Sequence, residues 1–102
     1  MKTGIELITE ERQKQIDKHG FTAEHHALNS KKWYKEGQLI EASIKLSYTI
    51  PYNEEPKNWD ETWFNKLCNR PYKERLVIAG ALIAAELDRL NYLEENNTDS
   101  RV

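Results

Sequence analysis

Residues 71–92 carry the sequence pattern that most constrains the fold of this chain. Apolar side chains recur there at the three- and four-residue spacing of a helix, in two adjoining stripes. The stripes consist of Tyr72, Leu76, Ala79, Ile83 and Leu90, and of Val77, Gly80, Ala84 and Leu87 beside them. A helix that is apolar over so much of its circumference is buried among other elements. Because proline is favoured in the first turn of a helix, we predict a long, mostly buried helix from Pro71 to Tyr92.

The start of the chain predicts another helix, from residue 3 or 4 to residue 19. Thr3 can cap this helix, because Glu6 follows at the spacing of a capping box. Gly20 is typical of the residue that ends a helix. In the irregular connection that follows, residues 22–25 could nucleate a single turn.

The middle of the chain predicts a second main helix and one short helix. Apolar residues at helical spacing place the main helix from residue 30 or 35 to about residue 48. In the connection 49–70, Pro51 and Pro56 exclude regular helix at those points. Residues 58–67 have acidic residues near their start, which favours a short helix. We therefore expect an all-α fold: three main helices plus a short helix in a long aromatic loop, forming a small helical bundle.

Length and charge restrict the domain organisation and the partners. At 102 residues, the chain is expected to form a single helical domain, residues 1–92, followed by a polar, frayed tail, residues 93–102. Charged residues make up 31% of the chain and the net charge is −2, with the two signs interspersed. Because the sequence has no block of lysine and arginine residues, we expect no duplex nucleic acid as a partner. A small core with a highly charged exterior instead favours burial against a partner or self-association.

The apolar runs and the cysteine count predict a cytoplasmic protein without a membrane partner. The longest apolar run, Leu76–Ala85, has ten residues, whereas a helix needs about 20 to cross a bilayer. The first residues lack the apolar segment of a signal peptide. Cys68 is the single cysteine, so no disulfide can form within the chain.

Two residues of the predicted long helix are unfavourable at their positions unless a neighbouring group compensates for them. Gly80 costs a helix roughly 1 kcal/mol relative to alanine. Together with small neighbours such as Ala84 it forms a ridge that favours close approach of another helix or, alternatively, of a ligand. Glu86 places a carboxylate on the apolar stripe, where it must be paired or bound. An ion pair with Arg12 or Arg75, or a position at the edge of the core, would satisfy it; a metal or ligand role is the alternative.

Four segments, taken together, resemble a family of small phage and prophage proteins. They are Ile8–Ile16, Gly20–His25, Gly37–Leu39 and Arg75–Leu90. Trp59 and Trp63 are similar to the central tryptophan-rich segment of that family. That family has no established activity. Its members tend to have the sequence Glu-His-Asp-Asp where this chain has Glu-His-His-Ala at residues 24–27. The resemblance implies a phage-type protein without defining its chemistry.

Residues 34–42 are similar, over a shorter stretch, to a helix of the all-α nucleotide pyrophosphohydrolases of the MazG type. That resemblance implies Mg²⁺-dependent hydrolysis with paired glutamates. Only Glu41 stands where the family has an acidic residue, because Tyr34, Lys35 and Gln38 replace the others. Mg²⁺ requires anionic oxygen ligands, so these replacements favour binding without catalysis.

Histidines form a further candidate site. His25 and His26, with Glu24 and His19, could bind a transition metal, because imidazole suits zinc, copper or nickel. Solvated loop histidines are the alternative. Cys68 lacks the surrounding signature of a thiol nucleophile, which favours a half-buried structural cysteine.

The connection before the last helix carries the preferred ligand site. Trp59 and Trp63 could stack on bases, a contact worth roughly 1–3 kcal/mol each. Arg70 and Arg75 could bind phosphate through paired hydrogen bonds. The alternative is that both tryptophans pack the loop onto the helices.

These features together favour a non-catalytic, phage-type binding protein. Its partner would be a host protein or a nucleotide-like small molecule, by analogy with anti-defence proteins that sequester a signalling nucleotide in the host cytoplasm. We expect a homo-oligomer and no cofactor. The expected ligand-binding residues are Trp59, Trp63, Arg70, Arg75, Glu41 and Glu86. One alternative is a divergent Mg²⁺-dependent nucleoside-triphosphate pyrophosphohydrolase with Glu24, Glu41 and Glu86 as metal ligands; another is a structural, oligomerising protein.

Overall fold

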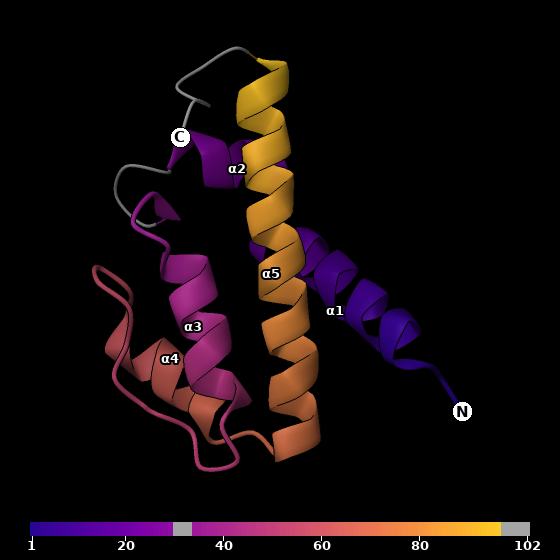
Figure 1. Cartoon of the computed structure of the whole chain (residues 1–102), viewed down its shortest axis with the longest axis vertical. Coiled ribbons are helices and arrows are strands. Elements are labelled where there is room, and N and C mark those ends of the chain that lie inside the picture. The colour runs from indigo at the N-terminus through magenta and orange to yellow at the C-terminus, as the bar shows by residue number, and fades with distance from the viewer. Residues whose placement is uncertain (30–33, 97–102) are drawn as a thin grey trace.

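A computed structural model describes residues 1–29 and 34–96 as a bundle of helices joined by turns and loops (Figure 1). The helices are α1 (Gly4–His19), α2 (Ala23–Leu28), α3 (Gln38–Ser47), α4 (Glu61–Cys68) and α5 (Tyr72–Glu95). No strand occurs in these residues. The predicted all-α bundle is therefore confirmed. It contains two short helices, α2 in addition to the expected α4. None of the described helices is long and apolar enough to cross a membrane.

The last helix, α5, is the element on which α1, α2 and α3 pack. In Figure 1 it stands upright in the middle of the molecule, with α3 alongside it and α1 crossing it, and α1, α2 and α3 all contact it. The buried apolar core is formed by Tyr34, Leu39, Ala42, Leu46, Phe64, Cys68, Ile78, Ala79, Leu82 and Ala85. Cys68 is buried there, more deeply than the half-buried position that the sequence predicts, and its burial raises the pKa of the thiol.

Local capping signals place the first two helices. Thr3 and Glu6 form the predicted capping box at the start of α1, in which each side chain accepts a hydrogen bond from the backbone N–H of the other residue. Gly20 ends α1 with a φ of 66°, in the left-handed region that glycine tolerates. Thr22 caps α2 by accepting a hydrogen bond from the backbone N–H of His25. The single turn expected here is therefore a complete short helix.

Two helix boundaries differ from the sequence prediction. The helix α3 begins at Gln38 rather than at residue 35, because Gly37 has a φ of 79° and interrupts helical geometry. The other predicted start, Ser30, lies outside the described residues. The helix α5 continues past Tyr92 to Glu95, since the polar residues that follow include no proline or glycine to end it.

Gly80 allows α1 to lie close against α5. A Cβ atom at this position would lie 2.5 Å from Cδ1 and 2.9 Å from Cγ1 of Ile8, well inside van der Waals contact. The space that a side chain would need is therefore occupied by Ile8. This confirms the close helix neighbour predicted from the small-residue ridge, and it leaves no room for a ligand at Gly80.

Replacing Gly80 with leucine is expected to destabilise the protein by about 1–3 kcal/mol, because the larger side chain displaces Ile8 and α1 from α5. Gly80→Ala should have a smaller effect, since a gain of roughly 1 kcal/mol in helix propensity opposes the contact with the end of a flexible side chain. Urea denaturation followed by circular dichroism measures both changes. In an Ile8→Ala background the loss caused by Gly80→Leu should shrink, and an undiminished loss would contradict this account of the contact.

Candidate binding groove

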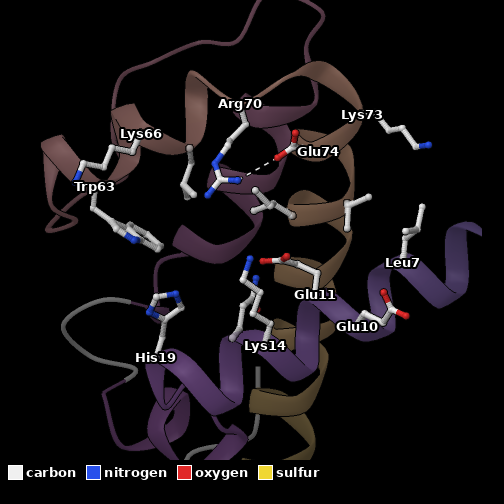
Figure 2. A pocket seen from close by; sticks show the side chains of 14 residues that line it. Leu7, Glu10, Glu11, Lys14, His19, Trp63, Lys66, Arg70, Lys73 and Glu74 are labelled. Atoms are coloured by element: carbon white, nitrogen blue, oxygen red, sulfur yellow. Dashed lines mark hydrogen bonds and ion pairs between the residues drawn. The ribbon is translucent and has the colours of Figure 1, made fainter. Parts of the chain in front are cut away.

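A groove of about 500 Å³ lies between α1 and the α4–α5 side of the molecule (Figure 2). From α1 it is lined by Leu7, Glu10, Glu11, Lys14, Gln15 and His19. The opposite side consists of Trp63, Lys66, Leu67, Arg70, Lys73, Glu74, Val77 and Ile78. The site is therefore assembled from segments far apart in the sequence, and no single segment contains it.

The lining of the groove combines buried and exposed side chains, and the buried ones include the polar Gln15, which is 5% exposed. Among the lining residues Ile78 is buried and Val77 is partly buried, whereas the lysines are exposed. Figure 2 shows the ring of Trp63, the imidazole of His19 and the charged end of Arg70 turned toward the same space, with Lys14 beside them. An aromatic face and several hydrogen-bond donors therefore converge on one volume.

The charge of the groove is slightly positive. Its lining holds four lysine or arginine side chains and three glutamates. Two of the glutamates are engaged: Glu74 accepts a hydrogen bond of 3.0 Å from Arg70 Nη1, and Glu10 Oε2 lies 2.8 Å from Lys2 Nζ outside the groove. Within the described part of the chain, three lining lysines make no ion pair: Lys14, Lys66 and Lys73. These ammonium groups could bind an anionic ligand by donating hydrogen bonds to it.

Two of the six predicted ligand-binding residues lie in the groove. Trp63 and Arg70 both line it, from α4 and from the turn that follows. The ring of Trp59 contacts that of Trp63, with 5.6 Å between centroids, but Trp59 packs against the core and does not line the groove. Trp59 therefore packs the loop onto the helices, as one alternative predicts. Trp63 contacts the ring of Phe21, with 6.1 Å between centroids, and also lines the groove.

Arg75 has a structural role and lies outside the groove. It is 4% exposed. Its guanidinium donates hydrogen bonds of 2.6–3.0 Å to the carbonyl oxygens of Leu46, Tyr48, Thr49 and Arg70. Carbonyls at the end of a helix have no partner within that helix. Arg75 satisfies the carbonyl of Leu46 in the last turn of α3 and those of the two residues just after the helix, and so connects the end of α3 to the start of α5. The predicted phosphate contact is not compatible with this arrangement.

Glu86 is held by an ion pair on its own helix. Arg89 Nε and Nη2 donate to the two oxygens of Glu86 at 2.8 and 2.7 Å, and both side chains are largely buried. The predicted pairing of Glu86 with Arg12 or Arg75 is therefore wrong, because residues three apart lie on the same side of a helix. Arg12 instead binds Asp88, with 3.0 Å between Nε and Oδ2.

The three carboxylates of the pyrophosphohydrolase alternative do not form a metal site. Glu41 Oε2 lies 2.6 Å from Lys45 Nζ, and Glu24 accepts a hydrogen bond of 3.2 Å from the hydroxyl of Tyr92. Glu86 is held in the ion pair described above. Among residues 1–29 and 34–96, no three His, Cys, Asp or Glu side chains lie together in a way that could hold a metal ion. The arrangement therefore does not fit Mg²⁺.

The adjacent histidines belong to an aromatic cluster. His26 is fully buried, with its ring centroid 4.5 Å from that of Tyr34 and 5.5 Å from that of Phe21. Burial lowers the pKa of His26 to about 3, so its imidazole is neutral at pH 7. His25 Nε2 lies 3.2 Å from the hydroxyl of Tyr34, whereas His19 lines the groove. The predicted metal site is absent from these described residues, and the alternative of solvated histidines is wrong for His26.

The contribution of α1 to the groove is not among the sequence predictions. Leu7, Glu11 and Lys14 recur at helical spacing and lie on the groove side of α1. That spacing is visible in the sequence. It does not reveal which helix faces these residues, because the crossing of α1 over α5 determines what lies opposite. The position of Lys14 on the same side of the predicted first helix as Leu7 and Glu11 is a signal that the sequence does carry.

The groove suits a flat, anionic ligand. Its aromatic face can stack on a ring, and its cations can donate charge-assisted hydrogen bonds to an anion. No family model, curated protein or solved structure matches this chain. The functional argument therefore depends on the chemistry of the groove.

Proposed function

We propose that the groove binds a nucleotide-like small molecule, and that the protein acts by holding this ligand without transforming it. The observation that supports the proposal is the position of Trp63 and Arg70 in one groove, with Lys14 of α1 beside them. A base stacked on Trp63 gains roughly 1–3 kcal/mol. A phosphate near Arg70 and Lys14 gains charge-assisted hydrogen bonds. Together these groups favour a ligand that carries both an aromatic ring and a phosphate.

The size and lining of the groove support a small molecule as the ligand. Its volume of about 500 Å³ falls within the range of roughly 300–1,000 Å³ that is typical of small-molecule sites. Leu67 and Val77 give it an apolar wall, which reduces the water around a bound ring and strengthens the polar contacts at the edge.

The carboxylates of the groove support binding rather than hydrolysis. Hydrolysis of a phosphoanhydride by a metal-dependent enzyme needs several anionic ligands around Mg²⁺. Glu10 is paired with Lys2 and Glu74 with Arg70. Glu11 is the remaining glutamate of the lining, and one carboxylate is too few to hold a catalytic metal.

The biological role that we propose is sequestration. The resemblance to small phage proteins, together with a groove for a nucleotide-like ligand, favours removal of a signalling nucleotide in the host cytoplasm as a form of anti-defence. This role requires affinity and no turnover. It rests on the resemblance for the setting and on the groove for the chemistry.

Isothermal titration calorimetry with linear and cyclic nucleotides is expected to give binding for at least one of them. Trp63→Leu should weaken that binding about tenfold or more, because stacking is lost. Lys14→Ala should weaken it about fivefold, because one cation near the phosphate is removed. The ligand should be recovered unchanged after incubation with Mg²⁺, as chromatography of the mixture would show.

Matched controls separate binding in the groove from a general charge effect. Lys18→Ala removes another exposed lysine of α1 that does not line the groove, and should leave affinity unchanged. A nucleoside and inorganic pyrophosphate, titrated separately, should each bind more weakly than the nucleotide. If every nucleotide fails to bind, or if Lys18→Ala and Lys14→Ala weaken binding equally, the proposed function is wrong.

A further inference from the structure

The helix α5 exposes four large apolar side chains. Tyr72, Leu76, Ile83 and Leu87 are 43, 40, 46 and 58% exposed, respectively. Their spacing of four, seven and four residues places them along one side of the helix, over a length of about 22 Å. These four residues are called the α5 stripe below. None of them lines the groove.

The α5 stripe has the shape of a helix-packing surface. Single exposed apolar residues are common on monomeric proteins, whereas a contiguous apolar row marks an interaction site. Between Leu76 and Ile83, Gly80 carries no side chain, and Ile8 of α1 occupies the adjacent space. Apolar residues at such spacing pack against a second helix with the same pattern.

The charges at the two ends of α5 favour an antiparallel neighbour. The first turn contains Lys73, while the last turn contains Glu94 and Glu95 and no basic residue. This distribution opposes the helix macrodipole, which favours anions at the N-terminal end and cations at the C-terminal end. Glu74, also in the first turn, is already paired with Arg70. A second α5 running in the opposite direction would place opposite charges at both ends, whereas a parallel one would place like charges together.

We propose that the α5 stripe is a homodimer interface, in which α5 packs antiparallel against α5 of a second copy about a twofold axis near Ile83. A twofold axis makes one stripe self-complementary, so the same residues supply both halves of the interface. In this register Leu76 of one copy lies near Leu90 of the other. Lys73 of one copy lies near Glu94 of the other. The α5 stripe itself lies outside the groove, whereas Lys73, at the end of the interface, is also one of the lysines that line the groove.

Sedimentation velocity of the full chain over a wide concentration range tests the interface. The wild-type chain should form a dimer as its concentration rises. Ile83→Asp should raise the dissociation constant of the dimer by about 100-fold or more, because it buries two unpartnered carboxylates. Ile50→Asp is the matched control, since Ile50 is 85% exposed in the loop after α3, and it should not change dimerisation. Circular dichroism and melting temperatures establish that both variants are folded.

Charge exchange tests the orientation of the two helices. Without ligand, Lys73→Glu should weaken the dimer about fivefold, and adding Glu94→Lys should restore it, because the exchanged charges face each other again. Failure of this rescue would overturn the antiparallel arrangement. A wild-type chain that stays monomeric at every concentration would overturn the proposal. An Ile83→Asp variant that dimerises as tightly as the wild type would overturn it as well.

Discussion

Replacing Arg75 with methionine is expected to lower the free energy of unfolding by about 3 kcal/mol. Methionine retains much of the packing volume but donates no hydrogen bond. The carbonyl oxygens of Leu46, Tyr48, Thr49 and Arg70 would then lose the donor that they share. Because Arg75 is only 4% exposed, little water can replace it. Urea denaturation monitored by circular dichroism measures the loss.

Two variants separate this role of Arg75 from a general effect of positive charge. Arg70→Met removes an exposed arginine whose ion pair with Glu74 is solvated, and should cost no more than about 1 kcal/mol. The loss in free energy of unfolding for Arg75→Lys should fall between those of the two methionine variants. One ammonium group cannot reach all the carbonyls that a planar guanidinium reaches. Equal losses for Arg70→Met and Arg75→Met would contradict the structural role assigned to Arg75.

Lowering the pH from 7 to about 4.5 is expected to destabilise the protein by about 2 kcal/mol through His26 alone. Burial, followed by the positive charge of Arg12 and by His25, lowers the pKa of His26 to about 3, and Arg89 of α5 acts in the same direction. The unfolded chain binds a proton at this position near pH 6.5, and the folded chain does not. The contribution of neutral His26 to the free energy of unfolding is therefore complete above pH 6.5, and it is lost progressively as the pH falls toward 3.

The contribution of His26 can be isolated by comparison with His26→Gln. Glutamine has a similar size and no charge at any pH, so this variant should lack the decline between pH 6.5 and 4.5. The free energy of unfolding of both proteins is measured in urea at a series of pH values. Carboxylates such as Glu6 titrate in both proteins and cancel in the difference. A difference that stays constant across this pH range would show that the buried imidazole is not the cause.

The order of the helices could be predicted because its signals are local. Thr3 and Glu6 form a capping box within one turn, and the proline before α5 and the glycine after α1 mark boundaries by their backbone preferences alone. The close contact at Gly80 could be predicted because a glycine within an alanine-rich helix lowers helix propensity, and close packing of a neighbouring helix offsets that loss. The start of α3 could not be predicted, since it depends on the positive φ of Gly37.

The groove could be predicted only in part. The sequence associates Trp63 with Arg70 because both lie in the connection before the last helix, and both line the groove. Lys14 lies at the other end of the chain and reaches the groove through the packing of α1 on α5. The sequence favours phosphate as the partner of Arg75 because a basic side chain near tryptophans fits an anion site. Its partners are backbone carbonyls, which every residue carries and no sequence pattern marks.

The role of α5 as a shared packing surface also has a consequence for the synthesis of the protein. The helices α1, α2 and α3 all contact α5, and all precede it in the chain. During translation they leave the ribosome before the surface that covers their apolar residues exists. The core can therefore close only after residues 72–95 have emerged, and until then the nascent chain exposes side chains such as Leu39 and Leu46 to chaperones and to other nascent chains.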